Sequence, residues 1–101
     1  MATLTLVSWR DIPSQVIAKQ GRQNAKVLLP PRFQHAIDRA AMRAGKGGSD
    51  AYMADWQRSA RRKCGDDLQA EVDAEAARLE ARFDDEELNR LVRQKGLSVP
   101  T

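Results

Sequence analysis

Apolar and polar side chains alternate along the first part of the chain, which reads TLTLVSWRDIPSQVI over residues 3–17. Alternation with a period of two is typical of β-strands. The pattern is interrupted at residues 10–14, where Pro13 lacks an N–H donor and restricts the backbone of the residue before it. The sequence therefore predicts an antiparallel β-hairpin over about residues 3–18, with a polar turn at residues 10–14.

A hairpin of two strands is only marginally stable in water, so a third strand or a covering helix is expected. Residues 26–29, KVLL, fit a short third strand. They equally fit an extended lead into a helix, because Pro30 and Pro31 cannot continue a strand ladder. The residues before them, 19–26, are predicted to form a polar connection that turns at Gly21.

After Pro31 the apolar residues recur every three or four positions, which is the period of an amphipathic helix. Ser49 is a candidate N-cap, Gly45 and Gly96 are candidate helix ends, and residues 97–101 are expected to form a loose tail. The predicted helices cover about residues 31–44, 50–63, 66–83 and 85–95.

Strands followed by a run of helices predict the α+β class. The expected fold is an N-terminal antiparallel hairpin, or a small three-stranded sheet, packed by three to four helices. A length of 101 residues is enough for one domain with a modest core, so residues 1–101 are expected to form a single domain.

The sequence also indicates in which cellular compartment the protein is expected. No stretch approaches the roughly 20 apolar residues of a membrane span. The N-terminus lacks the basic and apolar regions of a secretory signal, and the single Cys64 cannot form an internal disulfide. A cytoplasmic protein is therefore expected.

The formal net charge of +3 is unevenly distributed. Residues 1–50 contain eight Lys or Arg and three Asp, whereas residues 51–101 contain nine Lys or Arg and eleven Asp or Glu. A basic segment can attract phosphates, and it can also simply keep a small sheet soluble. The candidate anion-binding residues are Lys19, Arg22, Lys26 and Arg43.

The chain has few of the side chains that usually form catalytic or metal-binding sites. One histidine, His35, and one cysteine, Cys64, cannot form a zinc site in a monomer. The acidic run at residues 84–87 lacks the ligand spacing of a calcium loop. Three cations precede Cys64 and would lower its pKa, but the predicted position at a helix C-terminus opposes a thiolate. No catalytic residue, metal ligand or cofactor is expected, and the protein is not expected to be an enzyme.

Interaction with another protein is the remaining expectation for so small a chain. Tryptophan and arginine are enriched where proteins bind one another. The predicted partner-binding residues surround the first turn and include one residue of the first helix: Trp9, Arg10, Asp11, Gln15 and Arg39. Arg10 and Asp11 could instead close the turn through a local ion pair. If Arg10 binds the partner, Arg10→Ala should weaken the complex and leave the melting temperature within a few degrees.

Several segments together resemble the virulence factor domain family. They read VSWRDIPSQVIAKQGR, LPPRFQHAIDRAAMRAG, GSDAYMADW and GDDLQAEVDAEAARLEARFD, and the resemblance extends over about residues 4–92. The family includes short stand-alone bacterial proteins, and a similar domain occurs in a larger conserved virulence factor, virulence factor C, that carries helical repeats. Stand-alone relatives are often encoded near folate- or corrinoid-dependent one-carbon enzymes. The resemblance thus implies an accessory subunit, and it implies neither toxin activity nor secretion.

The expected function is a small cytoplasmic, non-enzymatic accessory domain that binds a partner protein. The alternative is a domain that binds nucleic acid or a phosphorylated ligand through the basic N-terminal half. A third hypothesis is a subunit that lends Arg10 or Arg39 to the anionic substrate of another chain. Self-association is compatible with each of these.

Overall fold

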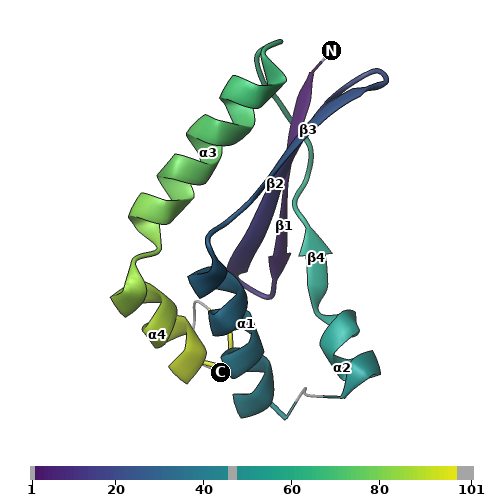
Figure 1. The fold of residues 1–101 in the computed structure, drawn as a ribbon. Coiled ribbons are helices and arrows are strands. Elements are labelled where there is room, and N and C mark those ends of the chain that lie inside the picture. The colour runs from purple at the N-terminus through teal and green to yellow at the C-terminus, as the bar shows by residue number, and fades with distance from the viewer. Residues whose placement is uncertain (1, 46–47, 98–101) are drawn as a thin grey trace.

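The computed structural model describes residues 2–45 and 48–97, which form an α+β fold of five strands and four helices (Figure 1). The fold class predicted from the sequence is confirmed. In chain order the elements are β1 (Thr3–Trp9), β2 (Ile12–Gln20), β3 (Gln23–Leu28), α1 (Pro31–Arg43), α2 (Ser49–Ala54), β4 (Trp56–Arg58), β5 (Arg62–Lys63), α3 (Leu68–Arg82) and α4 (Asp85–Arg93).

The sheet is antiparallel, with β1 in its interior. Its strand order is β3-β2-β1-β4, and β5 pairs with β1 beyond β4. The predicted hairpin of β1 and β2 is confirmed, but its turn is shorter than residues 10–14 and consists of Arg10 and Asp11 alone. Pro13 lies within β2, opposite Ser8 and beside an irregularity in the register, where a strand tolerates proline.

The third strand, which the sequence left open, is present. β3 begins at Gln23, three residues before the predicted start at residue 26, and ends at Leu28. It pairs with β2 from Gln20↔Gln23 to Gln15↔Leu28. The predicted polar connection over residues 19–26 is therefore mostly strand. Its turn is formed by Gly21 and Arg22, and Gly21 takes a φ of 60° that suits glycine.

The helix predicted over residues 50–63 is wrong beyond Ala54. α2 ends there, and β4 and β5 follow along the free edge of β1. The Ser59 N–H donates to the Leu6 carbonyl at 2.9 Å, and the Leu6 N–H donates to Ser59 Oγ at 2.9 Å. Since an unpaired edge of a sheet needs such partners, this pairing outweighs the local helical pattern.

The other three helices match the predictions to within about two residues. α1 has Pro31 in its first turn, and the N-caps Asp67 and Asp84 each accept a backbone N–H at the start of α3 and α4. Gly45 and Gly96 have φ values of 73° and 86° after α1 and α4. Of the tail predicted over residues 97–101, residues 98–101 lie outside the described residues.

The core lies between one face of the sheet and α3, and continues among α1, α4 and the β1–β2 turn (Figure 1). Its largest fully buried side chains include those of Trp9, Phe33, Ile12 and Ile37. Within residues 2–45 and 48–97 no helix is long and apolar enough to cross a membrane.

Candidate functional site

The two faces of the sheet have different surroundings. Leu4 and Val16 are buried on the face that α3 covers, where Arg62 of β5 forms an ion pair with Glu75 of α3 at 2.9 Å. Because neighbouring residues of a strand point to opposite faces, Thr5 and Ile17 lie on the other face, and both are only partly buried. We call this second side the open face.

At one end of the open face lies a shallow depression of about 510 Å³, which we call the open-face patch. It is lined by Val7, Ser14, Gln15, Leu28, Tyr52, Met53, Trp56, Gln57 and Arg58. Leu28 and Met53 are 68% and 64% exposed, although both side chains are large and apolar. Tyr52 and Trp56 are half-buried beside them and meet edge to face, with ring centroids 5.9 Å apart. The patch thus combines exposed aliphatic side chains with fixed aromatic rings.

Cations extend the open face beyond the patch. The register places Lys63 opposite Thr3, Thr3 opposite Lys19, and Lys26 opposite Ile17. Residues opposite one another in an antiparallel ladder share a face, so these three lysines lie on the open face. Each of them is exposed. We call Lys19, Lys26 and Lys63 the lysine strip.

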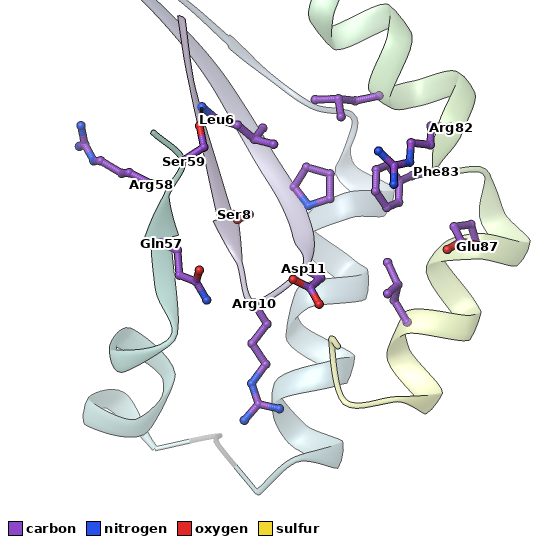
Figure 2. A pocket seen from close by; sticks show the side chains of 13 residues that line it. Leu6, Ser8, Arg10, Asp11, Gln57, Arg58, Ser59, Arg82, Phe83 and Glu87 are labelled. Carbon is purple, nitrogen blue, oxygen red and sulfur yellow. Dashed lines mark hydrogen bonds between the residues drawn. The ribbon is translucent and has the colours of Figure 1, made fainter. Parts of the chain in front are cut away.

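A second depression, the sheet–helix groove, has a volume of about 340 Å³ and lies between β1 and β4 on one side and α3 and α4 on the other (Figure 2). Its polar lining includes Gln57 and Ser59 from β4 and the residue after it, and Arg82 and Glu87 from the two helices. Figure 2 shows the side chain of Arg58 directed away from the helices. The groove therefore mixes both signs of charge. Among residues 2–45 and 48–97 no three His, Cys, Asp or Glu side chains are grouped as metal ligands.

Trp9 is fully buried, which corrects its predicted role as a residue that touches a partner. Its indole Nε1–H donates to the Tyr52 carbonyl at 2.8 Å, and the two rings stack with centroids 6.1 Å apart. The side chain joins the first hairpin to α2. It can influence a partner only by holding Tyr52 and its neighbours in place.

Arg10 is held by the fold rather than presented to solvent. Its Nε donates to Asp55 Oδ2 at 3.2 Å, its Nη1 donates to the Lys95 carbonyl at 2.8 Å, and its guanidinium lies 5.1 Å from the centre of the Trp9 ring. Only 15% of the side chain is exposed. A carboxylate that pairs with Arg10 is thus that of Asp55, 45 residues away in sequence.

The remaining three predicted partner-binding residues lie in three different places. Asp11 is exposed, lines the sheet–helix groove and donates its N–H to the Gly96 carbonyl at 2.8 Å. Gln15 lies in the open-face patch. Arg39 is exposed on α1, where its Nη1 lies 3.4 Å from Asn89 Oδ1 of α4. The structure therefore does not bring the five residues into one site.

The predicted anion-binding residues divide in a similar way. Lys19 and Lys26 share the open face, and Arg22 is exposed in the β2–β3 turn at the same end of the sheet. Arg43 is the last residue of α1, at the opposite end of the molecule (Figure 1). Lys63 and Arg58 are not among the predicted site residues, because the sequence pattern places both on a helix over residues 50–63. Only the pairing of β4 and β5 with β1 places them on the same face as Lys19 and Gln15, with β1 between them.

Cys64 follows β5, not a helix as predicted. Its N–H donates to the Ala2 carbonyl at 3.1 Å. Burial raises the pKa of the Cys64 thiol, and the nearby carboxylate of Glu71 adds to the shift. An activated thiol needs the opposite shift, so the surroundings of Cys64 do not favour nucleophilic chemistry.

Comparison with known proteins gives a single family assignment. No curated protein and no solved structure matches the chain. A family model described as Virulence factor matches residues 7–92, which run from the last three residues of β1 to the next-to-last residue of α4. The match covers well over half of the chain, and it agrees with the resemblance carried by the hairpin and α1. The chain belongs to the Virulence factor family.

Proposed function

We propose that this protein is a cytoplasmic, non-enzymatic accessory domain that binds a partner protein through the open-face patch. The observation that carries the proposal is the exposure of Leu28 and Met53 beside the half-buried rings of Tyr52 and Trp56. Protein interfaces are enriched in aromatic residues, methionine and arginine, and Arg58 completes that set at the rim.

Covering this patch would be favourable. Full burial of one leucine or methionine side chain contributes about 1.5–3 kcal/mol. Because Leu28 and Met53 are 68% and 64% exposed, covering both would supply about two-thirds of twice that amount, or about 2–4 kcal/mol, which approaches the lower end of the cost of association. The half-buried rings of Tyr52 and Trp56 are already ordered by their contacts with Trp9 and with each other, so they lose little side-chain entropy on binding.

The partner class that the family resemblance favours is a folate- or corrinoid-dependent one-carbon enzyme. The domain would then act on a larger catalytic chain without supplying chemistry of its own. Arg10, held by Asp55 and Lys95, is less suited to reach a substrate in that chain than Gln15 or Arg58, which border the open-face patch.

The test is capture of partners from the native cell lysate with the tagged 101-residue chain, followed by mass spectrometry. Leu28→Ser/Met53→Ser should reduce recovery of a stoichiometric partner at least about tenfold, because about 1.4 kcal/mol of lost binding suffices for that change. Met42→Ser is the matched control, since Met42 is 74% exposed on α1 outside the patch. Equal recovery with both variants would refute the proposal.

A second candidate function is binding of nucleic acid or a phosphorylated ligand. It is supported by the position of Lys19 and Lys26 with Lys63 on one face. Phosphate binding by such a group should weaken steeply as salt is raised. Titration with DNA and RNA at two salt concentrations tests it, and absence of binding at low salt would exclude it.

A further inference from the structure

The charge on the open face carries information about what covers it. None of the five strands contains an acidic residue. Of the five cations in the strands, Arg62 faces α3 and pairs with Glu75, while the lysine strip and Arg58 lie on the open face. Four cations thus share a surface to which no strand contributes a carboxylate.

Apolar and basic parts of the open face are separated along the strands. The patch lies at the level of Val7, which is opposite Gln15 and Arg58, whereas Lys19 and Lys63 lie opposite Thr3. Four residues of strand separate these levels, which corresponds to about 13 Å. A ligand that covers the whole face must therefore present apolar groups at one end and negative charge at the other.

A second copy of this chain does not fit face to face. Two open faces brought together would place the lysine strips either against each other, where like charges cost several kcal/mol, or against the apolar patch, where no strand supplies a carboxylate to pair with them. Nucleic acid fits less well than protein, because single strands bind flat surfaces by stacking bases on exposed rings. Between the lysines of the strip lie Thr3, Thr5 and Ile17, and the rings of Tyr52 and Trp56 are at the apolar end and already packed.

We infer that the open face is a docking site for an acidic segment of the partner protein, whose apolar side chains fill the open-face patch and whose carboxylates meet the lysine strip. This inference rests on the proposed function and adds the chemistry of the partner. The segment covers the face of the sheet opposite α3, which places a packed layer on each side of β1 and β2. The lysines steer the segment and fix its direction along the strands.

The experiment uses two labelled peptides and the intact protein. One peptide has a first half rich in leucine and phenylalanine and a second half rich in glutamate, and in the other each glutamate is replaced by lysine. Fluorescence anisotropy should show binding of the acidic peptide, weakened by salt, and at least about tenfold weaker binding of the basic peptide. In NMR spectra the acidic peptide should shift the backbone amide resonances of Gln15, Ile17 and Lys26.

Charge reversal gives the second arm. Lys19→Glu/Lys26→Glu should weaken binding of the acidic peptide, and of the captured partner, at least about tenfold. Arg43→Glu/Arg93→Glu is the control, because it changes the net charge equally at two exposed residues of α1 and α4. It should leave binding of the peptide and of the partner unchanged. Circular dichroism and thermal melting of both variants show that the fold is retained.

Four results would overturn the inference: equal binding of the two peptides, shifts confined to α1 and α4, tighter binding of an oligothymidine than of the acidic peptide, or concentration-dependent shifts of the open face without any peptide. If recovery of the captured partner falls in the Leu28/Met53 variant but not in the Lys19/Lys26 variant, the proposed function stands and the inference of an acidic segment is refuted. If neither variant reduces recovery, both the proposed function and the inference are refuted.

Discussion

Replacing Arg10 with alanine is expected to lower the free energy of unfolding by about 2 kcal/mol, within a range of about 1–3.5 kcal/mol. The side chain makes an ion pair with Asp55, which contributes up to about 1 kcal/mol at a partly exposed position. Its hydrogen bond to the Lys95 carbonyl contributes about 0.5–1.5 kcal/mol, and its position over the Trp9 ring about 0.5–1 kcal/mol. In a domain of this size the melting temperature should fall by roughly 10–20 °C.

Urea unfolding followed by tryptophan fluorescence measures this loss, with an unchanged m-value as the sign that the unfolded state is not altered. Arg10→Gly separates the side chain from the backbone, because Arg10 has a φ of 52° that glycine adopts without strain. It should be no less stable than Arg10→Ala. A double-mutant cycle with Asp55→Asn should return a coupling energy of about 0.5–1 kcal/mol.

A loss below about 0.5 kcal/mol for Arg10→Ala would refute this reasoning, since that is the range of surface substitutions without structural partners. Arg10 would then be available to bind a partner, as the sequence alone suggested. The expected large loss also means that a weakened complex in Arg10→Ala does not by itself identify a contact residue.

Three further predictions concern the C-terminal half. Gly96→Ala should lower the free energy of unfolding in urea by about 2–4 kcal/mol, because φ is 86° and the new Cβ would lie 2.8 Å from the Trp9 ring. Gly45→Ala, where φ is 73° and no atom of the described residues lies near the new Cβ, should lower it by only about 1–2 kcal/mol. Equal losses in the two variants would contradict this prediction. A hydrogen bond from a guanidinium one turn along α4 lowers the pKa of Glu87, so its contribution to stability is present above the unfolded pKa and is lost as pH falls through the folded pKa. Stability measured below about pH 4.5 should therefore fall less steeply in Glu87→Gln than in the unchanged protein, and parallel curves would count against the ion pair. Because burial raises the pKa of Cys64, iodoacetamide at neutral pH should modify it more slowly in the folded chain than in urea, and equal rates would show an unperturbed thiol.

The first hairpin and three helices could be predicted because their signals are local. Period-two alternation identified β1, and the buried stripe of α1, which includes Phe33 and Ile37, follows the helical period. The N-cap of α3 at Asp67 and the glycine after α4 are likewise visible in a short window of sequence. In each case local propensity and tertiary packing favour the same structure.

The second half of the predicted helix over residues 50–63 could not be recognised locally. Met53, Trp56 and Ala60 have helical spacing, and the arginines around them are good helix formers. What places Trp56 in a strand is its pairing with Trp9, a contact that no local window contains. The candidate site was lost with the same error, because Arg58 and Lys63 reach the open face only through β4 and β5.

The interior position of β1 has a consequence for synthesis. β1 is paired on one side by β2, which follows it at once, and on the other by β4 and β5, which lie about 50 residues further along the chain. At typical elongation rates the ribosome needs roughly 2–10 s to cover that distance. During this interval the nascent hairpin has Leu6 and its neighbours on an unpaired edge, which is the kind of surface that recruits strands from other chains. Chaperones that shield extended apolar segments would be needed most in the seconds before Trp56 leaves the exit tunnel, and slower translation over residues 30–55 would lengthen that exposure.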